Sequence, residues 1–264
     1  MIYVNNKSDF YRERYDKDMR YEELTIEGRN AVLEAFRAGK TIDKIFIQNN
    51  SHDGPIKTIT TKAKKSDAII NFVTKERLDQ MSQTGQHQGV IAYAAAYEYA
   101  ELEDIFEEAE KKGEAPFILL LDGIEDPHNL GAIIRTAHQA GAHGIIIPKR
   151  RAVGLTATVA KTSAGAINYL PVAKVTNLSV TIDELKKKGM WFVCADMDGE
   201  LMYNLDLKGS IGLVIGSEGD GVSRLVKEKC DFIAKIPMYG QVDSLNASVA
   251  AGVMAYEIVR QRLN

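Results

Sequence analysis

The chain has 264 residues, of which 45% are hydrophobic and 26% charged, and its net charge is −3. This composition excludes a disordered chain, and the length is sufficient for two globular domains. The apolar runs are far shorter than the roughly 20 residues that span a bilayer, and no signal peptide is visible. The two cysteines form no pairing motif, so we expect reduced thiols and a cytoplasmic location.

The first part of the chain predicts a short extension and a small domain. Residues 1–20 are polar and mixed in charge, and we predict a flexible N-terminal extension there. A helical period follows from Ala31 and ends at Gly39, since glycine suits the left-handed position after a helix. Short apolar runs predict three strands, at 45–47, 68–73 and 90–94. Residues 21–97 are therefore interpreted as a small α/β domain.

An acidic segment separates this domain from the rest. Residues 98–114 contain eight acidic and two basic side chains, whereas residues 1–97 and 115–264 carry net charges of +2 and +1. Its apolar side chains share one helical face and its glutamates the other. Lys111-Lys112-Gly113 is typical of a helix end, because cations favour the C-terminal dipole. We interpret residues 98–114 as a solvated linker helix.

Residues 115–264 predict a second α/β domain. Five short, mostly apolar runs are typical of parallel strands buried on both faces: 117–121, 145–147, 191–195, 211–215 and 232–236. Helical patterns lie between them, and a long one at 245–263 closes the chain. Ligands of open parallel sheets bind in loops that follow the carboxyl ends of strands. Three such loops have an unusual composition here.

The first loop follows 117–121 and leads into an apolar helix. Asn129 is predicted to cap that helix. Arg135 lies in the helix beside isoleucine and alanine side chains. Two interpretations stay open for Arg135. Its stem covers apolar surface or its charge pairs with an acid, or else the guanidinium is a planar fork for phosphate.

The second loop follows 211–215 and contains Gly216, Ser217, Glu218, Gly219, Asp220 and Gly221. Its glycines allow positive φ and a close approach of ligand to backbone. Its two acids disfavour phosphate, so an uncharged or cationic ligand such as a sulfonium fits better. A plain glycine turn is the alternative.

The third loop joins 232–236 to the final helix. Ser244 is predicted to be the N-cap of that helix. Asn246 and Ser248 follow, where stronger helix formers would be expected, and this mismatch indicates a site. The chain has no Walker A, HExxH, paired CxxC or GxSxG motif, and its histidines show no metal spacing. We therefore predict no metal site.

The three loops together resemble the motifs of the SpoU branch of the SPOUT methyltransferases. The matching residues are Asn129-x-Gly131-Ala132-x-x-Arg135-Thr136-Ala137, then Leu213-Val214-Ile215-Gly216-Ser217-Glu218-Gly219, then Ile236-Pro237-Met238 followed by Ser244-Leu245-Asn246-Ala247-Ser248-Val249-Ala250. The N-terminal part resembles the substrate-binding domain of the branch that modifies large-subunit (23S) ribosomal RNA. That likeness is carried by Gly28-Arg29-Asn30-Ala31-Val32-Leu33-Glu34-Ala35 and His87-Gln88-Gly89-Val90.

The resemblance implies an architecture. The C-terminal domain, 115–264, would be an α/β SPOUT domain with a parallel sheet and a deep trefoil knot. The N-terminal domain, 21–97, would be an L30e-like α/β sandwich that binds substrate RNA. The protein would form a homodimer through its catalytic domains. S-adenosylmethionine would bind in the knot, in contact with Gly216, Ile236 and Leu245 and with Met238 nearby.

The resemblance also implies a reaction, which is methyl transfer to a ribose 2′-hydroxyl of RNA, with a guanosine of 23S ribosomal RNA favoured. Arg135 would act on the RNA. Because a guanidinium holds its proton tightly, we expect it to bind the adjacent phosphate and favour the developing alkoxide. Glu218 is expected to orient Arg135, and Asn129, Ser244 and Asn246 are expected to position the ribose.

Three alternatives to this reaction stay open. The first is a transfer RNA 2′-O-methyltransferase, since relatives of that kind share the motifs. The second is a non-catalytic RNA-binding protein of the same fold. The third is a small-molecule α/β enzyme, which would have no need of a separate front domain.

Overall fold

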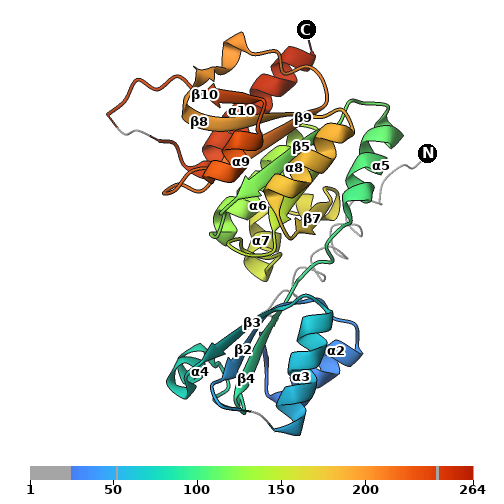
Figure 1. Cartoon of the computed structure of the whole chain (residues 1–264), viewed down its shortest axis with the longest axis vertical. Coiled ribbons are helices and arrows are strands. Elements are labelled where there is room, and N and C mark those ends of the chain that lie inside the picture. Colours follow the sequence, from blue (N-terminus) through green and yellow to red (C-terminus); the bar gives the residue numbers. More distant parts are fainter. Residues whose placement is uncertain (1–24, 52, 242–243, 264) are drawn as a thin grey trace, which may run out of the picture. The chain divides into compact units, whose positions relative to one another are not determined.

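The computed structural model describes residues 25–51, 53–241 and 244–263, so the predicted extension at 1–20 lies outside the described residues. Two compact units make up the described chain (Figure 1). The N-terminal unit runs to Glu98 and includes Gly154–Ala157, and the C-terminal unit contains Tyr99–Val153 and the chain from Thr158 onward. No helix in the described ranges is long and apolar enough to cross a membrane.

The N-terminal unit is built on a mixed sheet of order β1-β4-β2-β3. Its strands are β1 (Thr25–Glu27), β2 (Ile42–Gln48), β3 (Ile69–Val73) and β4 (Val90–Ala94). β2 and β3 are parallel, whereas β4 runs antiparallel to β1 and β2. The helices are α2 (Arg29–Arg37), α3 (Gly54–Lys65) and α4 (Lys75–Met81). The core is aliphatic and includes Val32, Ile45, Ile59 and Val90. The three predicted strands are confirmed, and β1 is too short to give a pattern.

The C-terminal unit is built on a parallel sheet of order β10-β8-β9-β5-β6-β7. Its strands are β5 (Phe117–Asp122), β6 (Gly144–Pro148), β7 (Val172–Val175), β8 (Trp191–Leu201), β9 (Ile211–Gly216) and β10 (Phe232–Lys235). The five predicted strands and the predicted parallel α/β architecture are confirmed. β7 was not predicted, because Lys174 interrupts its short apolar run. The trefoil knot stays a prediction.

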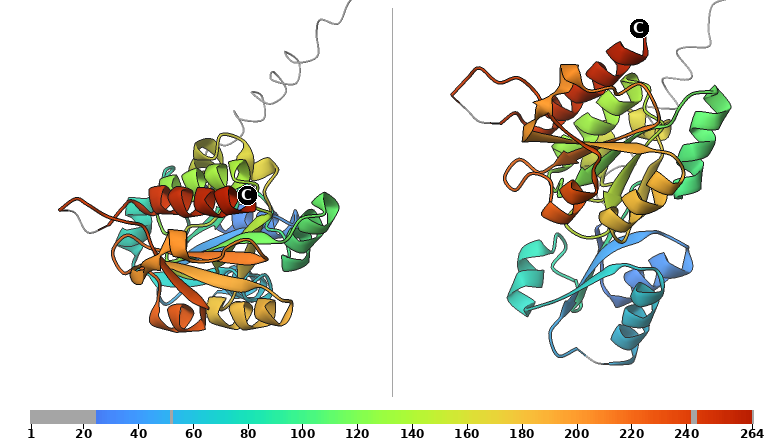
Figure 2. Two further views of the ribbon diagram at one scale, coloured as in Figure 1. Left: turned by 90° about the horizontal axis from the view of Figure 1, so that it is seen from above. Right: turned by 45° about the horizontal axis from the view of Figure 1, so that its top comes forward.

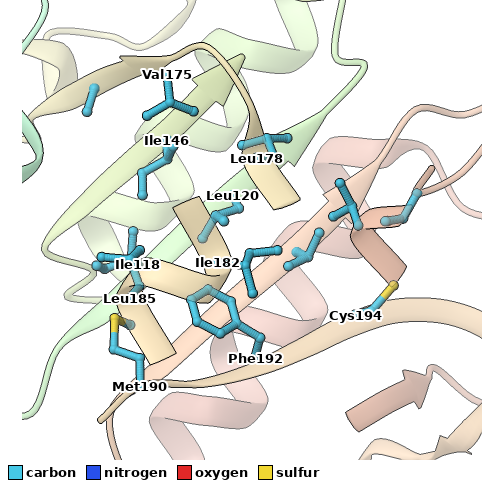
Figure 3. Packing of buried hydrophobic residues seen from close by; sticks show 14 of the residues in the cluster. Ile118, Leu120, Ile146, Val175, Leu178, Ile182, Leu185, Met190, Phe192 and Cys194 are labelled. Atoms are coloured by element: carbon cyan, nitrogen blue, oxygen red, sulfur yellow. The ribbon is translucent and has the colours of Figure 1, made fainter. Parts of the chain in front are cut away.

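Helices cover both faces of this sheet, as the left view of Figure 2 shows. One layer contains α6 (Pro127–Gln139) and α10 (Ala247–Arg262), which pack against each other, with α7 (Ala157–Thr162) and the short η1 (Ala166–Asn168) beside α6. The other layer contains α8 (Leu178–Lys187) and α9 (Arg224–Lys229). Beneath that layer, Leu120, Ile146, Ile182 and Phe192 form a fully buried core (Figure 3). The short η2 (Met202–Asn204) follows β8 and contacts α10.

The acidic segment 98–114 does contain a helix, α5 (Leu102–Lys112), which ends at Gly113 with φ 66°. The Asp104 carboxylate accepts a hydrogen bond from the Glu101 backbone N–H over 2.8 Å at its start. The interpretation as a solvated linker helix needs correction. Ile105 is fully buried in the core of the C-terminal unit, and Leu102 and Phe106 pack against that core. The helix therefore belongs to the C-terminal unit, because its apolar face has a sheet to cover.

Candidate active site

A cavity of about 380 Å³ lies at the carboxyl ends of β9 and β10, against the middle of β8. Its walls come from 195–198, 215–221, the chain after β10 and the start of α10. All the residues expected to contact the methyl donor line it: Gly216, Ile236, Met238 and Leu245. Glu218 and Ser244 of the expected catalytic residues line it as well.

The loop after β9 doubles back tightly on itself. The backbone N–H of Ser217 donates to the Gly221 carbonyl over 3.2 Å, and that of Gly221 donates to the Ser217 carbonyl over 3.0 Å. A Cβ atom on Gly216 would lie 2.1 Å from the Gly221 carbonyl carbon. Glycine is thus required at 216, because the backbone at Gly221 leaves no room for a Cβ atom there. Within this loop the positive φ expected from its glycines occurs at Gly221, with φ 65°.

Glu218 joins the three motif loops. Its Oε1 accepts hydrogen bonds from Asn129 Nδ2 over 2.8 Å and from Asn246 Nδ2 over 2.5 Å, with the Ala247 backbone N–H at 3.4 Å. Asn246 Nδ2 also lies 2.9 Å from Asn129 Oδ1. We call Asn129, Glu218 and Asn246 the polar triad. The triad links the first turn of α6, the loop after β9 and the start of α10.

Two predicted helix caps were wrong. Asp126, not Asn129, caps α6, and its Oδ1 accepts from the His128 backbone N–H over 2.9 Å. Pro127 favours the first helical position, so the residue before it becomes the cap. Asn246, not Ser244, caps α10, with its Oδ1 accepting from the backbone N–H of Ser248 over 3.0 Å. In both cases the side-chain amide of the asparagine donates a hydrogen bond to Glu218.

Arg135 is exposed on α6 and does not line the cavity. The expected contact with Glu218 is not present, since Glu218 is bound to Asn129 and Asn246 instead. Among the described residues, no hydrogen bond or ion pair to Arg135 is found, so the acid-paired interpretation has no partner there. An exposed guanidinium on α6 is suited to an anion that approaches from solvent.

An acidic pair in β8, Asp196 and Asp198, lines the cavity and was not predicted from the sequence. Lys227 Nζ lies 2.9 Å from Asp196 Oδ2 and 3.7 Å from Asp198 Oδ2. Burial raises the pKa of the Asp196 carboxyl, but hydrogen bonds from Lys227 and the Asp198 backbone, with the Lys227 charge, lower it overall. Asp196 is therefore ionised at neutral pH. With Glu218 and Asp220 it makes the cavity favourable for a cation. The only signal in the sequence was two acids directly after the apolar run 191–195.

Family models match both parts of the chain. Residues 116–256 match the SpoU rRNA Methylase family, and residues 25–100 match RNA 2′-O ribose methyltransferase substrate binding. The chain belongs to the SpoU methylase family. One relative is YacO of Bacillus subtilis (strain 168), which is named as a TrmH-family tRNA/rRNA methyltransferase. It is 55% identical to this SpoU-family chain over 238 residues, covering 90% of this chain and 95% of YacO.

Solved structures share the fold of this SpoU-family protein. The SpoU methyltransferase AviRb from Streptomyces viridochromogenes, solved in complex with AdoMet, matches with a TM-score of 0.58 and 24% identity, covering 93% of this chain and 92% of AviRb. The A. aeolicus TrmH/SpoU tRNA modifying enzyme matches with a TM-score of 0.50 and 30% identity, over 55% of this chain and 75% of that enzyme.

Proposed function

We propose that this SpoU-family methyltransferase transfers the methyl group of S-adenosylmethionine to a ribose 2′-hydroxyl of RNA, in a guanosine of 23S ribosomal RNA. The observation that carries the proposal is the position of the polar triad at the rim of a cavity lined by Gly216, Ile236 and Leu245. A methyl donor and a polar anchor for a ribose would meet at that rim.

The cavity fits S-adenosylmethionine in size and chemistry. Its volume of about 380 Å³ lies within the usual range for small-molecule sites. Ile215, Ile236 and Leu245 give apolar walls for an adenine ring. The carboxylates of Asp196 and Glu218 favour a sulfonium charge. When bound, this group supplies an electrophilic methyl; the residues of the chain orient it and exclude water.

The RNA side of the reaction falls to residues at the cavity rim and to Arg135 outside the cavity wall. Asn129 and Asn246 offer amide groups that position the target ribose, and Ser244 adds a hydroxyl at the rim. Glu218 fixes both amides through one carboxylate oxygen. Arg135 holds the neighbouring phosphate and stabilises the negative charge that develops on the 2′-oxygen. Glu218 thus acts through the asparagines and not through Arg135.

The domain roles follow from the same assignment. We assign 21–97 to RNA substrate binding, 115–264 to methyl transfer, and 98–114 to a connecting helix held on the second domain. We propose a homodimer formed through the C-terminal units in the cytoplasm. Val249 and Tyr256 support the dimer: they lie seven residues apart on one face of α10, and each is about half exposed.

A transfer RNA substrate is the second candidate. It is favoured by two relatives: the B. subtilis protein, named as a methyltransferase of tRNA and rRNA alike, and the A. aeolicus protein, a tRNA modifying enzyme. The non-catalytic alternative is disfavoured, because a protein that only docked RNA would have no use for the cavity and the polar triad.

Two measurements test the proposal. Isothermal titration with S-adenosylmethionine should show one site per chain, and the absence of binding would exclude the enzymatic function. Primer-extension mapping of 2′-O-methyl stops, comparing RNA from a deletion strain with the parent, identifies the nucleotide. Loss of a stop in 23S ribosomal RNA supports the first candidate, and loss in a transfer RNA supports the second.

A further inference from the structure

Three consecutive basic residues, Lys149-Arg150-Arg151, follow the carboxyl end of β6. The cavity lies in the same sheet, at the carboxyl ends of β9 and β10. β6 is parallel to β5, and β5 is parallel to β9, so the loops after these strands emerge together. The side chains of Arg150 and Arg151 are exposed. We call residues 149–151 the basic loop. Neither the methyl-donor cavity nor the polar triad accounts for it.

The basic loop is held by the backbone on both sides. The Lys149 N–H donates to the Val175 carbonyl over 2.8 Å, and the Val153 N–H donates to the Ile124 carbonyl over 2.9 Å. Ala152, between them, is buried. The second of these bonds ties the basic loop to the loop that leads into α6. The backbone that carries Arg150 and Arg151 is therefore held in place by hydrogen bonds on both sides.

Arg151 has an unfavourable backbone conformation. Its φ is 58°, in the left-handed region that disfavours residues with a Cβ atom and suits glycine or asparagine. An arginine in that conformation indicates that its side chain serves a purpose that glycine would not.

The guanidinium of Arg151 faces the cavity rim. Its Nη2 lies 4.0 Å from Oδ2 of Asp220, a residue of the cavity wall, and the two side chains are 66% and 87% exposed. An ion pair this open and this long contributes little to stability. Arg151 can therefore exchange the carboxylate for another anion at low cost.

The rim needs such cations if RNA is to approach it. Asp196, Asp198, Glu218 and Asp220 all line the cavity, and their charges repel a phosphate backbone. Arg135 supplies one exposed cation on α6. The basic loop supplies more on the β6 side of the same edge. Phosphate contacts of this kind fix the position of a strand without reading its sequence.

We propose that Arg150 and Arg151 dock a backbone phosphate of the substrate RNA beside the methyl-transfer site, with Arg151 exchanging Asp220 for that phosphate. The inference rests on the proposed function and adds two positioning residues to it. These residues act on RNA binding and leave the methyl donor and the chemical step alone.

The test uses the full chain, with an in vitro transcript of 23S ribosomal RNA and a transfer RNA transcript as probes. The double variant Arg150→Ala/Arg151→Ala should bind its RNA about tenfold more weakly. The magnitude of the slope of log affinity against log salt should fall by about 0.7 to 0.9, as expected for the loss of one phosphate contact. KM for RNA should rise in step, while kcat at saturating RNA and the affinity for S-adenosylmethionine stay as in the parent chain. Lys187→Ala, which removes an exposed cation from α8, is the matched control and should change none of these.

A second variant separates RNA binding from folding. Arg151→Gly relieves the left-handed φ, so its Tm should equal or exceed that of the parent while RNA affinity falls. RNA affinity and salt slope unchanged in both variants, or lowered equally by Lys187→Ala, would overturn the inference. If the parent chain methylates RNA and the variants match it, only this inference fails. If the parent binds neither transcript nor S-adenosylmethionine, the proposed function fails with it.

Discussion

The side-chain amide of Asn246 donates to Oε1 of Glu218 over 2.5 Å, although Asn246 is also the N-cap of α10. One asparagine thus starts a helix with its oxygen and binds a carboxylate with its nitrogen. Because Glu218 also accepts from Asn129, the start of α10 is fixed relative to the start of α6. The geometry of the proposed ribose-binding groups therefore depends on a residue that needs no contact with RNA.

Glu218→Gln tests this dependence. A glutamine keeps the shape but loses the charge, and it cannot accept equally well from two amides. We expect kcat to fall by about 10²-fold, as is typical when reacting groups shift by about 1 Å. Asn246→Asp retains the helix cap but removes the amide donor, and its kcat should fall by a similar factor. An unchanged kcat in both variants would show that the triad does not order the site.

Gly216→Ala should remove binding of S-adenosylmethionine. Its Cβ would lie 2.1 Å from the Gly221 carbonyl carbon, so the loop that lines the cavity would have to move. Gly219→Ala is the matched control in the same loop, since a Cβ there meets nothing within 4 Å. Calorimetric titration of the two folded variants should separate them by at least about tenfold in Kd. Equal affinities would mean that the loop conformation is not what forms the site.

Arg135→Ala should abolish methyl transfer with S-adenosylmethionine affinity nearly unchanged, because Arg135 is exposed and lies outside the cavity wall. Arg135→Lys should restore little, since an ammonium cannot form the same fork with a phosphate. Single-turnover rates and calorimetric titration check both statements. An equal loss of cofactor affinity would place Arg135 in the donor site instead.

We expect the stability of the C-terminal unit to depend on pH because of His143. The imidazole is buried, its Nδ1 accepts from the Phe117 backbone N–H over 3.0 Å, and Nε2 lies 3.1 Å from Glu114. Burial, aided by the charges of Lys112 and Arg262, lowers the pKa of His143 below its ordinary value of 6.5, although Glu114 opposes this. The unfolded chain therefore takes up this proton first as pH falls. The contribution is fully present above pH 6.5 and is lost as pH falls through the lower folded value.

Urea unfolding followed by the fluorescence of Trp191, the single tryptophan, measures this loss from about pH 8 to about pH 5. His143→Asn keeps an acceptor but does not titrate, so the slope of its unfolding free energy against pH should be smaller. Identical slopes for the parent and the variant would assign the pH dependence to other groups.

The sequence predicted the parallel strands and the three loops because both leave local signals. Continuous apolar runs indicate strands buried on two faces, and unusual residues such as Asn246 in a helix start indicate a site. The polar triad could not be predicted in the same way. Asn129 and Glu218 are 89 positions apart, and Asn129 and Asn246 are 117 apart, so only the closed fold brings them together.

Local competition explains the remaining errors. Asn129 is a good capping residue, but Pro127 sets the start of α6 one turn earlier. The many acidic residues of α5 favoured the interpretation as a solvated helix. Burial of Ile105 on its apolar face instead packs the helix against the C-terminal unit. The Asp196–Lys227 pair joins a strand to a helix and leaves no periodic trace.

The measurement that tests the account most directly is nucleoside mass spectrometry of RNA incubated with the full chain and S-adenosylmethionine carrying a deuterated methyl group. We predict that the label appears in a 2′-O-methylated nucleoside, guanosine if 23S ribosomal RNA is the substrate, and that Arg135→Ala protein yields none. Label on a base, or no label in either 23S ribosomal RNA or transfer RNA, would contradict the assignment of this site to ribose methylation.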